Sequence, residues 1–419
     1  MKSHPFLFAF LGAVLLISAA HNPVLAQRMA TRTPEVLDAD GLSTALGGPT
    51  LLTLHLRDAE PAVVFAEIAK QIGQPIRIGT TNLEVWNGKR ITIDAERQPF
   101  WDVMQQLSRS IGFSWLHRTS QDGYIVAPSA TVPRELRSPS AEVGMVRIVA
   151  IEAKREQWIL GGFANPEEQG RENGDTLRLK FAVLPDPKLS IVNDTARFET
   201  VGASTEGGIP PHPVEMEGLK GSTGNFAPAV WQLQSDLRLY PSQTHKQLDF
   251  EGRLRFTAIT RSEQWRIENV LQAQETSRDF LTENGTVRVT FHGLHLDDGN
   301  PDLPKGRYTM ALSAKLLGGT NPRSDGQFLK ALNSYLVQAS RVTDERGVSL
   351  AFNSAAIANA EEKSPITYGR KRSTDSRDDA GEPTTYSVMV PLETREVTLP
   401  FELPHLSIPQ FPDEGHPLP

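Results

Sequence analysis

Two imidazoles and two carboxylates gather within residues 291–298, as His292, His295, Asp297 and Asp298. Such side chains are suitable ligands for zinc or for a harder divalent ion. The run reads as a strand, however, and a spacing of three along a strand points His292 and His295 to opposite faces. Only a break at Gly293 would bring them together. We therefore expect a strand end and a polar turn here, with no metal or other cofactor, and keep the four residues as the candidate ligands of the alternative.

Signatures of common enzyme classes are absent from the sequence. It contains no G-x-S-x-G, H-E-x-x-H, phosphate-loop or dinucleotide-binding motif. Serine, histidine and aspartate are present without a spacing that singles out a set, although catalytic triads assemble from distant positions. The chain has no cysteine, so thiolate zinc sites and disulfides are excluded. We expect no enzymatic activity, and a hydrolase with its site in the C-terminal half remains as an alternative.

The length and charge of the chain narrow the range of partners. It has 419 residues, a formal net charge of −7 and a pI near 5.9. This acidic balance argues against a nucleic-acid partner, which would require a basic face. The length predicts two or three domains and is sufficient for a large apolar core without disulfides.

The first 26 residues have the pattern of an export signal. Lys2 is followed by the apolar residues 6–20, and the small Ala26 stands before Gln27. This pattern is typical of a secretory signal peptide, and we expect cleavage between Ala26 and Gln27. The alternative is a membrane anchor, for which the apolar run is short. The mature protein is predicted to be periplasmic or exported, without a transmembrane helix, and residues 27–49 read as a polar linker.

Residues 50–129 contain a strand–helix pattern that is written twice. Ile72-Gly73 ends the first predicted helix and Ile111-Gly112 ends the second, an offset of 111 − 72 = 39 residues. With that offset, the alternating strand 52–54 matches 91–93, and the apolar helix positions Val64, Phe65 and Ile68 match Val103, Met104 and Leu107. Pro61 suits a first helical turn, with Asp58 as the candidate cap. Each half leaves one apolar helix face uncovered, so the two halves are expected to pack together.

These residues resemble a known family. The run Thr53-Leu-His-Leu-Arg-Asp-Ala-Glu-Pro and the run Phe65-Ala-Glu-Ile-Ala-Lys-Gln-Ile-Gly are similar to the secretin and TonB short N-terminal domain. So are Ile91-Thr-Ile-Asp, Val103-Met-Gln-Gln-Leu-Ser-Arg-Ser-Ile-Gly-Phe-Ser-Trp and Gly123-Tyr-Ile-Val. The resemblance implies a periplasmic module of two helices packed on small sheets, which works through protein contact and not through catalysis. It covers residues 52–127 and stops there.

Three tryptophans lie in or beside this module. Flat aromatic faces are often used to grip a partner. The pattern favours Trp115 as core and Trp101 as cover for a helix end, with a contact role for Trp101 as the alternative. The segment Trp86-Asn87-Gly88 is predicted to be a turn between strands. Trp86, Asn87 and Trp101 are therefore the candidate partner-binding residues.

Beyond a linker at 130–144, apolar residues alternate with polar ones almost throughout. Leu177, Leu179, Phe181 and Val183 form one such set, and Gly-, Pro- and Asp-rich turns separate the runs. This predicts antiparallel, sandwich-like β domains at 145–275 and 286–403. The segment 328–338 fits a helix, although its end also fits a strand. Residues 365–385 are predicted to be a mobile loop, and 404–419 a Pro-rich extended tail.

The sequence therefore predicts an α+β N-terminal module followed by mainly-β domains. The first functional hypothesis is a non-catalytic envelope protein whose module docks a protein partner while the β domains act as scaffold. Its mechanism would be surface burial or addition to a sheet edge. The second is carbohydrate or cell-wall binding through Trp231, Trp265 or Tyr240, although alternation favours a buried Trp231. The identity of the partner and the oligomeric state do not follow from the sequence.

Overall fold

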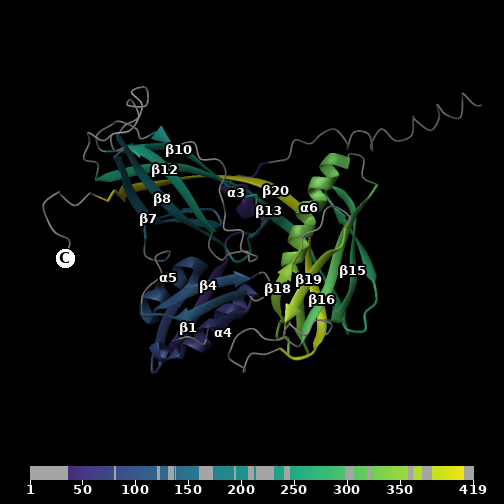
Figure 1. Cartoon of the computed structure of the whole chain (residues 1–419). Helices are drawn as coiled ribbons and strands as arrows, with labels where there is room; N and C mark the ends of the chain where they lie inside the picture. Colours follow the sequence, from purple (N-terminus) through teal and green to yellow (C-terminus); the bar gives the residue numbers. More distant parts are fainter. Residues whose placement is uncertain are drawn as a thin grey trace, which may run out of the picture. The chain divides into compact units, whose positions relative to one another are not determined.

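A computed structural model describes most of the chain (Figure 1). The described residues are 36–79, 82–119, 123–130, 136, 138–159, 173–192, 195–205, 212–213, 231–239, 246–297, 306–318, 322–356, 362–369 and 380–409. An N-terminal region of helices and small sheets is followed by mainly antiparallel sheets, as predicted. The predicted signal peptide with its cleavage site at Ala26 and Gln27 lies outside the described residues.

The N-terminal module is built from two interlocked halves. Its elements are β1 (Leu51–Ala59), α4 (Pro61–Ile72), β2 (Ile76–Ile78), the 3-10 helix η1 (Leu83–Trp86), β3 (Ile91–Pro99), α5 (Phe100–Ile111), β4 (Phe113–Thr119) and β5 (Gly123–Pro128). Strand β1 pairs with β3, and β2 pairs in parallel with β5, so each sheet takes strands from both halves. This exchange explains why neither half is complete alone.

The module's helices begin and end largely where the sequence predicts. Pro61 starts α4, where its missing N–H is not needed, and Gly73 ends it in the left-handed conformation. The N-cap is Glu60, however, and makes no side-chain cap, so Asp58 does not have the predicted capping role. The equivalent apolar positions of the two helices are all buried in one core: Val64, Phe65, Ile68, Val103, Met104 and Leu107.

The module shares its core with the sheet that follows it. Strands β7 (Val146–Ile159) and β8 (Asn173–Pro185) pair with each other, and their residues Val149, Ala182 and Leu184 belong to the module's apolar cluster. Their neighbours Ile148, Phe181 and Val183 point to a different cluster. The β7–β8 pair is therefore covered on both faces, which is unusual for an antiparallel sheet.

Two five-stranded sheets enclose the second apolar cluster. One has the order β11-β12-β8-β7-β6, with β6 at Ser140–Val143, β11 at His212–Pro213 and β12 at Trp231–Leu239. The other joins β10 (Arg197–Thr205), β13 (Gln247–Glu268), β20 (Pro383–Ser407) and β17 (Arg341–Asp344), with β9 (Ser190–Ile191) beside β13. Four phenylalanine rings, Phe181, Phe198, Phe250 and Phe401, meet in this cluster. The two sheets form a sandwich, as predicted, and we call it the first sandwich. Strands β17 and β20, however, come from residues 286–403, which the sequence assigned to a second β domain.

The paired strands β13 and β20 are long enough to contribute buried side chains to two different apolar clusters, one at each end. On β13 the core residues are even-numbered up to Ala258 and odd-numbered from Trp265 onwards. The pairing skips Thr260 on β13 and Leu392 on β20 between these two stretches. One extra residue changes which positions face inward. These bulges therefore let both ends of the same ribbon present apolar side chains to a core.

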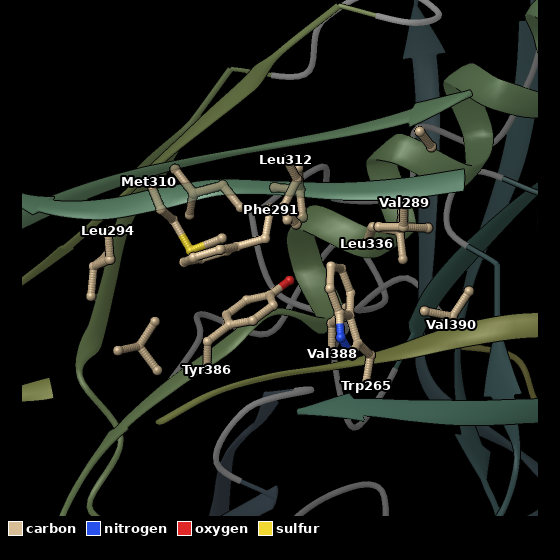
Figure 2. Close-up of a cluster of buried hydrophobic side chains, with 14 of the residues drawn as sticks. Trp265, Val289, Phe291, Leu294, Met310, Leu312, Leu336, Tyr386, Val388 and Val390 are labelled. Carbon is tan, nitrogen blue, oxygen red and sulfur yellow. The ribbon is translucent and has the colours of Figure 1, made fainter. Parts of the chain in front are cut away.

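The third cluster lies between the far end of this ribbon, helix α6 (Pro322–Ala339) and another five-stranded sheet. That sheet has the order β14-β15-β16-β19-β18, and its strands are Thr276–Thr282, Gly285–Leu296, Arg307–Leu317, Ser364–Gly369 and Ala351–Ala355 in the same order. Figure 2 shows Trp265, Phe291 and Tyr386 among the aliphatic side chains of this core. The undecided segment 328–338 is helical throughout.

Several regular elements lie inside segments that the sequence predicts to be linkers or tail. Helix α3 (Ala39–Ala45) lies in the predicted linker 27–49 and buries Leu42. Strand β6 lies in the predicted linker 130–144, and β14 lies across the predicted domain boundary near 276–285. Strand β19 occupies the start of the predicted loop 365–385, and β20 runs to Ser407, past the predicted boundary at 403. Short polar segments of this kind lack enough apolar residues to show a period.

Candidate functional site

Strand β15, which carries His292 and His295, has a β-bulge at Gly293, the position where a break would bring the two histidines to one face. Its pairing with β16 places Phe291 opposite Leu312 and Leu294 opposite Met310, so His292 and Gly293 share one opposing residue. Gly293 has a φ of +92°, which favours glycine. Because Phe291 and Leu294 are both buried, the bulge leaves His292 and His295 on the side away from the core. The expectation that the two histidines point to opposite faces is thereby corrected.

His292 connects a carboxylate to a hydroxyl. Its Nδ1 lies 2.7 Å from Glu275 Oε2, and its Nε2 lies 2.9 Å from Ser313 Oγ. The His292 side chain is 12% exposed, whereas that of Glu275 is 63% exposed. A hydroxyl bonded to an imidazole that is itself held by a carboxylate is the order found in sites of acyl transfer. These three residues form the candidate site, and we call them the β15 relay.

Three of the four candidate metal ligands, His292, His295 and Asp297, lie among the described residues. Among the described residues, no three histidine or acidic side chains are placed to hold a metal ion. His295 Nε2 lies over Gly293, 3.1 Å from where a β-carbon on that residue would stand. Asp297 follows at the end of the strand, and Asp298 lies outside the described residues.

The structure places two of the three predicted contact residues in the interior. Trp86 is 7% exposed, stacks on Phe65 at 5.6 Å and donates its indole N–H to Gly112 O at 2.7 Å. Trp101 is 5% exposed and donates to Pro185 O at 3.2 Å. Neither indole face is offered to a partner, which corrects the expectation of an aromatic contact surface. Asn87 alone of the three is exposed.

The exposed face of the β1–β3 sheet carries a second histidine cluster. His55 Nδ1 lies 2.6 Å from Asp94 Oδ1, and its Nε2 lies 3.2 Å from Glu96 Oε2. The hydrogen bond to Asp94, with smaller contributions from the two charges, raises the pKa of His55 above its ordinary value of 6.5. All three side chains are more than half exposed. This face is therefore polar, charged and open to solvent.

Polar contacts fix the module to the β7–β8 strands on another side. Asp186, which follows β8, accepts hydrogen bonds from Thr50 N at 2.7 Å and from Thr50 Oγ1 at 2.6 Å. Arg147 on β7 bonds Asp102 of α5. Gln74 donates to Pro187 O at 2.7 Å. Together with the shared core, these bonds join the module to the first sandwich.

Sequence reasoning found His292 but not its two partners. Glu275 is 17 residues before it and Ser313 is 21 residues after it. The alternation of Tyr308, Met310 and Leu312 does place Ser313 on the wet face of its strand. What the sequence could not supply is that β16 lies beside β15 in the register that brings Ser313 to His292.

Comparisons with known proteins identify no relative of this chain. No family model matches it, and neither a curated protein nor a solved structure does. Within the described part of the chain, no helix is both long and apolar enough to cross a membrane.

Proposed function

We propose that this protein is an adaptor of the bacterial cell envelope whose N-terminal module docks a protein partner. The observation that carries the proposal is the β1–β3 sheet, whose strands pair only with each other among the described residues. Each strand therefore has an outer edge with backbone groups outside any sheet. Such an edge is a template for an added strand.

The edge of β3 is the better candidate for an added strand. At the edge of β1, Thr53 is already engaged: its N–H donates to Gln71 Oε1 at 2.9 Å, and its carbonyl accepts from Gln71 Nε2 at 2.7 Å. The Gln71 amide thus occupies part of that edge as a neighbouring strand would. An extended segment of a partner would then lie along β3, beside the exposed residues Thr92 and Asp94.

The β domains fit the role of scaffold in this proposal. The module shares its core with Val149, Ala182 and Leu184, so it packs against the first sandwich and is not a separate domain. The envelope location rests on the export pattern of residues 1–26 and on the resemblance of residues 52–127 to a periplasmic domain. Carbohydrate binding finds less support, since Trp265 is buried between Phe280 and Tyr386. The Trp231 side chain and Tyr240 lie outside the described structure.

Site-specific photo-crosslinking of the full chain in its native envelope tests the proposal. The full chain is required because a fragment without β7 and β8 would lack part of the module's core. A crosslinker at Thr92 on β3 is expected to give one discrete protein adduct, and one at the exposed Lys330 on α6 to give none. Amides of β3 should also exchange more slowly with solvent when that partner is added. Equal crosslinking at both positions, or unchanged exchange, would overturn the proposal.

A further inference from the structure

The β15 relay lies outside the N-terminal module for which docking is proposed. It draws its residues from the segment before β14 (Glu275), from β15 (His292) and from β16 (Ser313). The two hydrogen bonds are 2.7 and 2.9 Å long, within the normal range. Both imidazole nitrogens are therefore engaged, one with a carboxylate and the other with a hydroxyl.

The fold holds these side chains by anchoring the strands beneath them. Phe291 and Leu312 are registered opposite each other and are buried in the third core. Their successors His292 and Ser313 must then point to the other face. The bulge at Gly293 adds a residue just after His292, and bulges commonly re-aim a side chain in this way.

We propose that Ser313 and His292 are the nucleophile and general base of an acyl-transfer site, with Glu275 as the residue that positions His292. The substrate class is small activated esters, since the relay lies on the solvent-facing side of a sheet where Ser313 is half-buried. This activity goes beyond docking and does not depend on it.

The reaction balances with the groups present and water. Ser313 Oγ attacks the ester carbonyl carbon while His292 Nε2 takes the hydroxyl proton. The single bond between the carbonyl carbon and the alcohol oxygen then breaks, and His292 gives the proton to this departing oxygen. Water attacks the acyl-serine by the same route in reverse, which releases the acid and restores the Ser313 hydroxyl. A bulge leaves its extra residue outside the regular ladder, so backbone N–H groups near Gly293 are the candidate donors to the developing oxyanion.

The same sheet supplies a matched control. Ser277 Oγ lies 2.8 Å from Thr290 Oγ1, and Thr290 is registered opposite Ser313. This serine shares the strand environment but has a hydroxyl and not an imidazole as its partner. Ser277→Ala should therefore leave any relay activity unchanged.

Hydrolysis of p-nitrophenyl acetate and labelling with a fluorophosphonate test the site in the full chain. The probe loses fluoride as its phosphorus bonds to the nucleophilic oxygen, and peptide mapping then locates the adduct. We expect the adduct on Ser313, and a loss of at least about tenfold in rate for Ser313→Ala and for His292→Gln, as general-base catalysis is worth about 10²–10⁴-fold. Labelling of another residue, or a rate that Ser313→Ala leaves unchanged, would overturn the assignment.

The role of Glu275 needs a readout that a purely structural side chain would not affect. Glu275→Gln should slow fluorophosphonate labelling of Ser313, and Glu275→Asp should restore part of the labelling rate because it returns the carboxylate. Melting temperatures of the two Glu275 variants should lie close to that of the parent, since the Glu275 side chain is exposed. Equal labelling by the Gln and parent proteins would remove Glu275 from the site.

Discussion

The ring of Phe401 covers Gly252 so closely that a β-carbon on Gly252 would overlap the Phe401 Cζ atom. The two residues are registered opposite each other on β20 and β13, inside the phenylalanine cluster. We expect Gly252→Ala to lower the free energy of unfolding by about 1–3 kcal/mol, because overpacking displaces a ring from a well-packed core. Urea unfolding followed by tryptophan fluorescence measures the change.

Gly202 on the neighbouring strand β10 is the control for this substitution. A β-carbon there would meet Glu251 Oε2 at 3.3 Å, and that atom is the far end of a flexible side chain. Gly202→Ala should therefore change the stability by less than about 0.5 kcal/mol, in the range of ordinary surface substitutions. Similar losses at both positions would show that the ring packing over Gly252 is not the cause.

The two repeat glycines of the module should respond very differently to the same substitution. Gly73 has a φ of +66° with open space around it, whereas Gly112 has a φ of +69° and faces the backbone oxygen of Ser129. Gly73→Ala meets backbone strain alone, with an expected cost of about 1 kcal/mol. Gly112→Ala also forces the chain apart and should cost at least about 2 kcal/mol more than Gly73→Ala, by the same overpacking argument. Thermal unfolding of the two single variants compares them directly, and equal losses would contradict the packing difference.

This contrast separates the features of the module that the sequence repeat predicts from those that it does not. The 39-residue offset predicted both helix ends, because a glycine after an apolar helix face is a local signal. It did not show that Gly112 lies against Ser129, since that contact depends on the register of the β4–β5 pair, in which Phe113 lies opposite Pro128. The alternating pattern of β8 was a local signal of the same kind. It predicted one buried face, and the residues of that face are all buried: Leu177, Leu179, Phe181 and Val183.

The other face of β8 also has a signal in the sequence. Ala182 and Leu184 are apolar at positions that a wet face would make polar, and the module covers them. A strand in which both the odd-numbered and the even-numbered residues are apolar is expected to be buried on both faces. The candidate site had no comparable local signal, because Glu275 and Ser313 meet His292 only through strand pairing.

The bond between Thr50 and Asp186 should carry much of the stability of the module's junction. Both residues are 4% exposed, and Asp186 also accepts from Lys188 N at 2.9 Å. Asp186→Ala leaves these donors unpaired, and each buried donor without a partner costs about 1–3 kcal/mol, so we expect a loss of about 2–4 kcal/mol. A double-mutant cycle with Thr50→Val should give a coupling above about 0.5 kcal/mol. Asp40→Ala on the exposed side of α3 is the control, and additive effects in the cycle would refute the coupling.

Asp344, at the end of β17, should make the stability of the protein depend on acidic pH. Its side chain is fully buried, and burial alone would raise the pKa of this carboxyl. Hydrogen bonds from Gly381 N and Val348 N, both 2.8 Å, and the Arg346 guanidinium outweigh burial and hold the pKa of Asp344 below its ordinary value of 3.8. Because the folded pKa is the lower one, the stabilisation is complete above the unfolded value of 3.8. It is lost as the pH falls below 3.8 and through the folded pKa.

Asp344→Asn tests this dependence because it keeps the size of the side chain and removes the charge. Hydrogen bonds to a charged group are worth about 1.5–3 kcal/mol, so at neutral pH the variant should be less stable than the parent by about that amount. The difference should shrink as both proteins are acidified below 3.8, where the parent carboxylate takes up its proton. Urea midpoints measured between neutral and acidic pH follow it, with Asp249→Asn as an exposed control. A difference that stays constant over this range would mean that the charge of Asp344 does not stabilise the fold.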